Sequence, residues 1–428
     1  MEKLVYIIQA PPFWLKTPPL SLAYLQSYLQ SKGINTGIID LNQELFINVG
    51  AGFKPAPTKR WLQLDEEFEK NLFGMVEKLY PEFLEKTFNR IKASEFIGFS
   101  LNRRNRHFSF SLATKIKERY PEKKIIFGGP ETLNLRLKSK LNPDYYWVIG
   151  EGEKALQAII EKNGSRVICH QELDDLDQLP FYDFDNLDGK GPGRPGPYSM
   201  TIPLFSSRGC PHQCKFCTER LLYKKVRQHS VDYMIEQIKL LKSRHQTNSF
   251  VFLDSLINYR TDWLRNFSQQ LIASNLNIKW EAQLRVDQSF PLEVAKLMKV
   301  SGCYNLFVGL ESASDKVLAA MNKGFTAAEA LTFLKTLDKA GLHFEISLIF
   351  GYPGEGKKEF QETINFIQNY KKLIPKIAQV NPYIDYFDSK HPEYSDTTQE
   401  RVNQFLALIN QERIPYTKSF INNLIYGN

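Results

Sequence analysis

Short apolar runs alternate with helical patterns over the first third of the chain. Residues 20–33, LSLAYLQSYLQSKG, carry apolar residues at helical spacing, and Gly33 marks the stop. Alternation of strands and helices is typical of a parallel, doubly wound α/β sheet of the Rossmann-like type. Its five predicted strands lie in KLVYIIQ (3–9), INTGIIDLN (34–42), FIGFS (96–100), KKIIFGGP (123–130) and YYWVIGEGE (145–153). A charged segment, residues 61–94, is predicted to be helical.

The same alternation returns in the second half of the chain. Helical patterns such as VDYMIEQIKLLKSR (231–244) and TAAEALTFLKTLDKAG (326–341) separate six further apolar runs. Six such repeats predict a partial (β/α)6 barrel, whose ligands are expected at the carboxyl ends of the strands. Its predicted strands lie in residues 203–207, 249–254, 278–284, 304–312, 344–351 and 377–383.

Glycine and proline mark the boundary between the two halves. The segment DGKGPGRPGP, residues 188–197, resists regular structure and is the clearest linker. We therefore expect a Rossmann-like domain at residues 1–170, a linker at 171–198, a partial barrel at 199–382 and a C-terminal extension at 383–428. The extension matches no pattern, and we expect it to close the open side of the barrel or to shape substrate entry.

Composition narrows the class of protein without naming a function. A chain of 428 residues is too long for one hydrophobic core, so two domains are expected. No apolar run approaches the roughly 20 residues of a membrane helix, and the first residues lack the pattern of a secretory signal. This predicts a cytoplasmic protein with no membrane partner. The net charge of +8 is best explained by solvated lysines, so a nucleic-acid partner is not expected.

Three of the five cysteines, Cys210, Cys214 and Cys217, lie in one short loop after the first barrel strand. An odd and clustered set does not form a disulfide framework. Zinc is one alternative, with His212 as a fourth ligand, although structural zinc sites usually draw on two separated ligand pairs. An iron–sulfur cluster fits better, because three thiolates leave one iron open, as in catalytic sites. Lys215 and Arg208 would offset the negative charge, and Cys169 and Cys303 lie in apolar contexts typical of buried thiols.

The loop CPHQCKFC resembles the CxxxCxxC signature of radical S-adenosylmethionine (SAM) enzymes, with the usual aromatic residue, Phe216, before the third cysteine. Four later segments, in the same order as in that family, extend the resemblance: FVFLD, LRVD, GLES and LIFGYPGE. Two positions depart from the family pattern, because Ser347 replaces a glycine and Glu355 is displaced by one residue. The family residues map onto Phe216, Asp254, Arg285, Glu311, Ser312, Ile349 and Gly351, all as SAM contacts.

The resemblance implies a [4Fe-4S] cluster on Cys210, Cys214 and Cys217, with SAM bound at the open iron and cleaved reductively to a 5′-deoxyadenosyl radical. It implies that Arg285 meets the SAM carboxylate, a charge-assisted contact, and that Glu311 meets the ribose, where a carboxylate can accept from both hydroxyls. Salt-bridged rim residues are the alternative for both side chains.

The N-terminal half raises a second cofactor question. The segment VIGEGEKAL contains G-x-G-x-x-A, which formally matches a dinucleotide-binding fingerprint. We do not favour that function, because Glu151 and Glu153 lie where the pyrophosphate would approach the helix. The fingerprint also belongs after the first strand of a sheet, whereas this segment contains the fifth. The pattern as a whole resembles the cobalamin-binding domain that precedes many radical SAM domains. That resemblance maps the lower face of the corrin and the nucleotide tail onto Ser100, Leu101, Asn102, Gly129, Pro130, Glu131, Gly150 and Glu151. A Rossmann-like domain that has lost its ligand is the alternative.

The cobalt-ligating D-x-H-x-x-G motif of other cobalamin folds is absent, and His107 is the only histidine before Cys169. This predicts cobalt without a protein imidazole, with Arg103 or Arg104 nearby.

The two resemblances together imply a cobalamin-dependent radical SAM methyltransferase acting on a carbon atom. The alternative keeps both cofactors but catalyses a rearrangement, cyclisation or oxidation. The expected partners are a small-molecule or peptide substrate and a one-electron reductant of the flavodoxin or ferredoxin type, under anaerobic conditions. Methylthiolation is not favoured, because those enzymes carry further cysteines before the barrel and none precedes Cys169 here. A cobalamin-binding scaffold would have no use for the cysteine loop.

Overall fold

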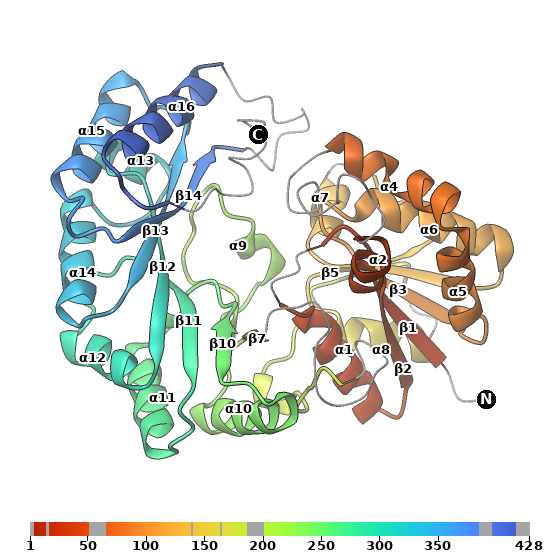
Figure 1. Cartoon of the computed structure of the whole chain (residues 1–428). Helices are drawn as coiled ribbons and strands as arrows, with labels where there is room; N and C mark the ends of the chain where they lie inside the picture. The colour runs from red at the N-terminus through yellow and green to blue at the C-terminus, as the bar shows by residue number, and fades with distance from the viewer. Residues whose placement is uncertain are drawn as a thin grey trace. The chain divides into compact units, whose positions relative to one another are not determined.

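The computed structural model describes residues 4–13, 17–50, 66–137, 140–162, 165–185, 201–384 and 396–416. These residues form two compact units, described separately below and drawn in Figure 1. Unit 1 comprises Met1–Ile202, Leu221–Arg227 and Glu236–Thr247, and unit 2 comprises Pro203–Arg220, Gln228–Ile235 and Asn248–Asn428. The predicted linker at residues 188–197 lies outside the described residues.

Unit 1 is built on one six-stranded sheet with the order β2-β1-β3-β4-β5-β6, and every pair of neighbours is parallel. The five predicted strands are present. A sixth, β6, is too short to show a period in the sequence. The strands are β1 (Leu4–Gln9), β2 (Asn35–Asp40), β3 (Phe96–Ser100), β4 (Lys124–Gly128), β5 (Tyr146–Ile149) and β6 (Val167–Cys169).

Helices cover both faces of this sheet, with α1 and α8 on one face and α4, α5 and α6 on the other (Figure 1). Side chains such as Phe99, Phe127 and Trp147 pack in one core with Phe108 of α6. The charged segment predicted as one helix is two, because Pro81 starts a new helix at its first position. The helices are α1 (Leu20–Ser31), α2 (Leu41–Gly50), α4 (Glu66–Leu79), α5 (Pro81–Ile91), α6 (Arg106–Arg119), α7 (Glu131–Leu137) and α8 (Glu153–Lys162).

Unit 2 carries a second six-stranded sheet whose strands follow one another in chain order, β14-β13-β12-β11-β10-β7. This order is that of a barrel opened along one side, as the six repeats predict. Register shifts interrupt the pairs β11–β12, β12–β13 and β13–β14, and the shift in β12–β13 lies at the carboxyl end of β12, between Gly309 and Glu311. The strands are β7 (Thr201–Leu204), β10 (Ser249–Phe252), β11 (Lys279–Leu284), β12 (Cys303–Glu311), β13 (Phe344–Phe350) and β14 (Lys376–Pro382).

Helices connect the strands of this second sheet, and a short ribbon of β8 and β9 lies outside it. The start of α14 is fixed by a capping box, in which Thr326 and Glu329 bond reciprocally to each other's backbone. The elements are β8 (Ser207–Arg208), β9 (Arg227–Gln228), α9 (Glu219–Leu222), α10 (Val231–His245), α11 (Thr261–Ala273), α12 (Leu292–Val300), α13 (Asp315–Ala320), α14 (Ala327–Lys339), α15 (Lys357–Asn369) and α16 (Asp396–Gln411).

The C-terminal helix α16 packs against β14 and β13, at one edge of the sheet (Figure 1). Val402, Phe405 and Ile409 are fully buried, and the ring of Phe405 lies 4.9 Å from that of Phe350 on β13. The helix is therefore part of unit 2. Within the described ranges, no helix is long and apolar enough to cross a membrane.

Candidate functional site

The cysteine loop starts directly after β8, at the carboxyl end of the first strand of the second sheet. Gly209 takes a φ of +88°, a backbone conformation that favours glycine, and turns the chain into the loop. Cys214 is buried, whereas Cys210 and Cys217 are half-buried. The N–H of Cys217 donates to the carbonyl of Cys214 at 3.2 Å, so the last four residues of the motif form a tight turn.

Asp254 fixes the segment that leads into this loop. It is fully buried beyond β10, and its carboxylate accepts hydrogen bonds from the backbone N–H of Ser206 and from the hydroxyls of Ser206 and Ser207, at 2.5 to 3.1 Å. Burial raises the pKa of Asp254, and these hydrogen bonds act in the opposite direction. The side chain predicted to contact SAM is thus engaged with the strand before the cysteines.

Burial makes the thiols of Cys210 and Cys217 reluctant to ionise. It raises the pKa of Cys217 to about 11, and the pKa of Cys210 is raised for the same reason. The neighbouring thiols add to both shifts. Within the described ranges, no three His, Cys, Asp or Glu side chains gather closely enough to hold one metal ion, as a zinc site would need. In an iron–sulfur cluster each thiolate binds its own iron.

Arg285 is a cation that contacts the loop. Its guanidinium donates to the sulfur of Cys214 at 3.3 Å and lies 5.5 Å from the centre of the Phe325 ring. Asn258 holds the backbone of Arg285 at both polar groups, accepting from its N–H at 3.1 Å and donating to its carbonyl at 2.8 Å. The arginine predicted from LRVD is therefore fixed beside the thiols.

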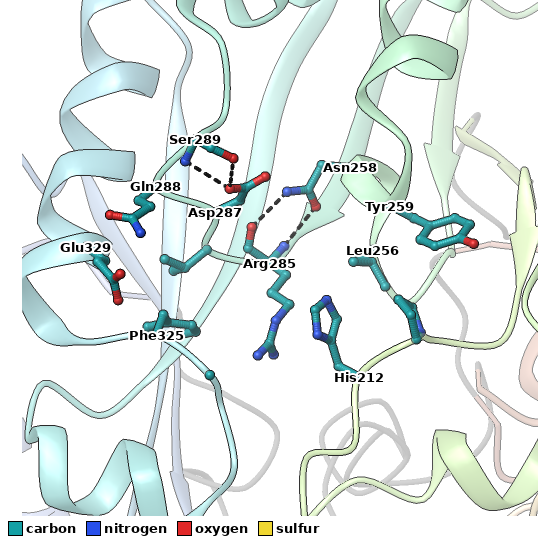
Figure 2. Close-up of a pocket in the computed structure, with 13 residues that line it drawn as sticks. His212, Leu256, Asn258, Tyr259, Arg285, Asp287, Gln288, Ser289, Phe325 and Glu329 are labelled. Atoms are coloured by element: carbon teal, nitrogen blue, oxygen red, sulfur yellow. Dashed lines mark hydrogen bonds between the residues drawn. The ribbon is translucent and has the colours of Figure 1, made fainter.

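A cavity of about 460 Å³ opens next to Arg285. Figure 2 shows Arg285 and His212 turned toward each other in this cavity, with Tyr259 and Leu256 on one side and Phe325 and Glu329 on the other. Burial lowers the pKa of His212 to about 4, and the charges of Arg285 and Lys323 add to the effect. The cavity is lined by Pro211, His212, Leu256, Asn258, Tyr259, Arg285, Val286, Asp287, Gln288, Ser289, Gly324, Phe325 and Glu329.

Glu311 ends β12 in a left-handed conformation with a φ of +68°, which is rare for a residue with a side chain. Its carboxylate accepts from the hydroxyl of Ser347 at 3.0 Å and lies 3.5 Å from the ammonium group of Lys323. Gly309 makes room for it, because a Cβ there would come within 2.7 Å of the carboxylate. Ser347, a departure from the family pattern, is thus a partner of Glu311.

Lys323 is a functional candidate that the sequence reasoning missed. Its side chain is only 5% exposed, and its ammonium group lies 5.7 Å from the Phe216 ring and 5.4 Å from the Phe325 ring. It connects Glu311 to the aromatic residue of the cysteine loop. The sequence feature that could have pointed to Lys323 is the turn motif NKG after α13, in which Asn322 and Gly324 have positive φ.

Phe216 and Ile349, predicted as SAM contacts from distant segments, meet in a small apolar cluster with Val317, Met321 and Tyr352. The N–H of Lys215 donates to the carbonyl of Met321 at 3.0 Å, which ties the cysteine loop to the end of α13. The cluster gives the site an apolar wall beside the thiols.

The two remaining predicted SAM contacts have structural partners. The hydroxyl of Ser312 lies 3.2 Å from that of Thr363 on α15 and accepts from the N–H of Ser314. Gly351 has a φ of +77°, and a Cβ there would lie 2.1 Å from the hydroxyl oxygen of Thr398 on α16. Its N–H donates to Glu355.

In unit 1 the predicted cobalamin residues lie at the carboxyl ends of β3, β4 and β5. Asn102 and Asn105 accept each other's backbone N–H, and Asn105 donates to the carbonyl of Ser100 at 2.9 Å. Leu101 is fully buried, and its backbone meets Gly129 so closely that a Cβ on Gly129 would lie 2.5 Å from the Leu101 oxygen.

Glu131 and Glu151 are buried, and each is paired with an arginine. Arg106 lies 2.7 Å from Glu131, and Arg227 contacts Glu151. Gly150 has a positive φ of +97°. Pro130 is exposed at the start of α7. At the carboxyl edge of the first sheet, the carboxylates of Glu131 and Glu151 are therefore both paired with an arginine.

The two arginines named for the cobalt environment differ in their surroundings. Arg104 forms an ion pair with Glu69 at 2.8 Å, and both side chains are largely buried. For Arg103, the described part of the chain offers no such partner. Arg103 and His107 remain half-buried near the edge of the sheet.

Comparison with known proteins finds a family model that matches part of this chain. Residues 204–367 match the family described as the Radical SAM superfamily. An uncharacterized methyltransferase of Pyrococcus horikoshii is 28% identical over 356 residues, which cover 77% of this chain and 75% of that protein. The anaerobic magnesium-protoporphyrin IX monomethyl ester cyclase of Cereibacter sphaeroides is 25% identical over 187 residues, 43% of this chain and 30% of the cyclase.

Two solved structures share the fold. OxsB, a cobalamin-dependent S-adenosylmethionine radical enzyme solved with aqua-cobalamin, matches with a TM-score of 0.66 and 16% identity over 96% of this chain. TsrM of Kitasatospora setae, a radical S-adenosylmethionine methyltransferase solved with cobalamin and a [4Fe-4S] cluster, matches with a TM-score of 0.60 and 14% identity, covering 89% of this chain and 75% of TsrM. This chain spans 56% of the length of OxsB. The predicted fold class, a Rossmann-like sheet followed by a partial radical SAM barrel, is confirmed.

Proposed function

We propose that this chain, whose residues 204–367 match the Radical SAM superfamily, is a cobalamin-dependent radical SAM enzyme that methylates a carbon atom of its substrate. The observation that carries the proposal is the contact between Arg285 and Cys214 in the middle of the CxxxCxxC loop. A guanidinium 3.3 Å from a thiol sulfur stabilises the thiolate that an iron–sulfur cluster needs. Bound together, the cluster, SAM and cobalamin supply a carbon-based radical and a methyl group.

The residues around the loop fit SAM as well as a cluster. Cys210, Cys214 and Cys217 would hold the cluster. Arg285 offers further guanidinium N–H groups to the carboxylate of SAM, and Asn258 keeps the arginine backbone in place.

The far end of SAM has its own candidates. Glu311 offers carboxylate oxygens to ribose hydroxyls, and Lys323 and Ser347 hold that carboxylate at the end of β12. Phe216 and Ile349 supply apolar surface on which an adenine ring can lie. Asp254 serves the site indirectly, because it holds the strand that precedes the cysteines.

The charges at the carboxyl edge of the first sheet fit cobalamin. A nucleotide tail carries a phosphate, and Arg106 and Arg227 neutralise the buried carboxylates of Glu131 and Glu151 that would repel it. Gly129 lets the chain after β4 pass directly against the backbone of Leu101, so these two loops lie close together at this edge. Arg103, which forms no ion pair among the described residues and acts on Glu69 only through its charge, is the candidate for the cobalt environment in preference to Arg104.

A second candidate function keeps both cofactors but does not methylate. The similarity to an anaerobic cyclase, over 43% of this chain, supports it. For either function we propose a small-molecule or peptide substrate, an external one-electron reductant of the flavodoxin or ferredoxin type, and an anaerobic reaction in the cytoplasm.

Anaerobic reconstitution of the full chain with iron and sulfide, followed by addition of hydroxocobalamin, tests the proposal. We expect about four irons per chain, bound cobalamin after desalting, and 5′-deoxyadenosine when SAM and dithionite are added. Cys214→Ala should abolish cluster formation. Cys169→Ala, which changes a thiol in unit 1, is the matched control and should leave the iron content unchanged.

Isotope transfer separates the two candidate functions. SAM labelled in its methyl group gives labelled product and S-adenosylhomocysteine if the enzyme methylates. Release of 5′-deoxyadenosine without methyl transfer would favour the non-methylating alternative. A cluster that forms equally well in Cys214→Ala would refute the assignment of the loop, and failure to retain cobalamin would refute the assignment of the first sheet.

A further inference from the structure

We infer that Arg401, on the C-terminal helix α16, is a positioning residue that holds the loop after β13 in the shape that binds the adenosine part of SAM. The inference rests on the proposed function, because it assumes that SAM binds at this edge of the second sheet. Helix α16 lies outside the segment that matches the family, residues 204–367. Its contribution to the site is therefore a property of this chain and does not follow from the family match.

The first step is an ion pair between α16 and the loop. A guanidinium nitrogen of Arg401 lies 3.0 Å from a carboxylate oxygen of Glu355, and the two side chains are 12% and 3% exposed. The other oxygen of Glu355 accepts from the backbone N–H of Gly351 at 3.1 Å. One carboxylate thus joins the helix to the first residue of the loop, and losing either partner would leave a charge buried.

The second step is a steric contact at the same place. Gly351 has a φ of +77°, and a Cβ built on it would lie 2.1 to 2.7 Å from three atoms of Thr398. The side chain of Thr398 fills the space that a side chain at position 351 would need. Helix and loop therefore contact each other at Gly351 as well as at Glu355.

The third step leads from the loop to the cysteines. Ile349 and Tyr352, on either side of Gly351, pack in the apolar cluster that includes Phe216. The Tyr352 hydroxyl lies within 3.4 Å of the carbonyl of Ala320 at the end of α13. Packed side chains and hydrogen bonds therefore connect Arg401 to the aromatic residue of the CxxxCxxC loop, and they can transmit a shift of α16 to the site.

The consequence is a defined effect on SAM affinity. If Arg401 is removed, Glu355 loses its charged partner, and the loop gains conformations that do not present Ile349 and the Gly351 backbone to adenosine. We expect Arg401→Gln to weaken SAM binding about tenfold, which corresponds to about 1.4 kcal/mol and lies within the usual range of such coupling. KM for SAM should rise while kcat at saturating SAM stays unchanged, because Arg401 touches no reacting group.

The experiment uses the anaerobically reconstituted full chain and measures the Kd of SAM by equilibrium dialysis. Arg401→Gln is compared with Arg401→Lys, which should recover most of the affinity, and with Arg413→Gln as control. Arg413 is exposed just past α16, and the described residues give it no ion pair. Iron content and cobalamin retention are measured in every variant and should not change. The double variant Arg401→Gln, Glu355→Gln should lose no more SAM affinity than the weaker-binding single variant, because the two substitutions break the same interaction.

SAM affinity in Arg401→Gln within twofold of the unaltered protein would overturn the inference. If Arg401→Gln does not take up iron, Glu355→Gln replaces it, since the amide oxygen can still accept from Gly351. Hydrogen exchange of peptides covering residues 349–356 provides a readout that needs no SAM, and exchange that is no faster in the variants also overturns the inference. If the unaltered protein binds no SAM at all, the proposed function fails, whereas the exchange measurement still tests the contact between helix and loop.

Discussion

Replacing Gly129 with alanine puts a methyl group where the chain has no room for one. The new Cβ would lie 2.5 Å from the oxygen and 2.9 Å from the nitrogen of Leu101. Both atoms belong to the backbone, so they cannot rotate away as the end of a side chain could. Each is also part of a hydrogen bond, from the Leu101 N–H to Gly128 at 2.7 Å and from the Glu131 N–H to the Leu101 oxygen at 3.3 Å.

The size of the effect can be worked out from a matched glycine in the same unit. Gly33 has a φ of +73° and nothing within 4 Å of its added Cβ, so alanine there meets only backbone strain. That strain is about 1–2 kcal/mol, offset in part by a less flexible unfolded chain. At Gly129, with a φ of +94°, the same strain applies. Two disturbed hydrogen bonds at about 1 kcal/mol each come on top, giving about 3–4 kcal/mol in total.

Urea-dependent hydrogen exchange of peptides from β4 and β5 measures this free energy locally, without assuming that the two units unfold together. We expect Gly129→Ala to lower the opening free energy of these peptides by about 2 kcal/mol more than Gly33→Ala does. Cobalamin retention should fall in parallel in Gly129→Ala alone. Equal losses in the two variants would show that the close approach of Leu101 and Gly129 does not exist.

Three further predictions concern single side chains. Asp254→Asn should lower the free energy of unfolding by about 2–4 kcal/mol and reduce the iron content after reconstitution, because an amide cannot accept from all the donors around it. Unchanged iron uptake and an unchanged unfolding temperature would contradict this. Arg104→Gln should destabilise the protein by about 3 kcal/mol through loss of its buried pair with Glu69, whereas Arg103→Gln should stay within about 0.5 kcal/mol in the same urea titration; equal effects would refute the distinction. Burial raises the pKa of Glu355 to about 7 from its usual 4.5, so the folded state holds the proton more tightly. Its contribution to stability is therefore present below pH 4.5 and lost as the pH rises through 7. In thermal melts the unfolding temperature of the native protein should fall relative to that of Glu355→Gln over this window, because the amide does not ionise; a difference that does not vary with pH would rule this out.

Both sheets were predictable because their strands carry the pattern locally. Each of the predicted runs became a strand, since apolar runs bounded by glycine and proline have few alternatives in an α/β chain. Helix α2 directly follows β2 without a turn signal and was missed. The boundary between α4 and α5 at Pro81 was predictable from one rule, because proline is favoured at the start of a helix and disfavoured in its interior.

The functional site was predictable only where residues act within their own segment. The cysteines and Arg285 could be named as candidates because CPHQCKFC and LRVD each resemble a family segment. The partner of Glu151 was out of reach, since Arg227 lies 76 residues away. The two serine partners of Asp254 were out of reach as well, since they lie 47 and 48 residues earlier. Pairings over such distances are decided by the fold, and neither periodicity nor spacing reveals them.

The irregular pairing between β12 and β13 has a consequence for sequence comparison. Gly309 pairs with Ser347 and Glu311 with Leu348, so Leu310 has no partner on β13. Side chains alternate between the two faces of a strand, so one extra residue exchanges the faces of everything that follows. Deleting Leu310 would restore regular pairing and turn Glu311 away from Ser347, although every other residue would be kept. In aligning distant relatives of this chain, a gap placed one position off in β12 would therefore assign the acidic residue to the wrong side of the sheet.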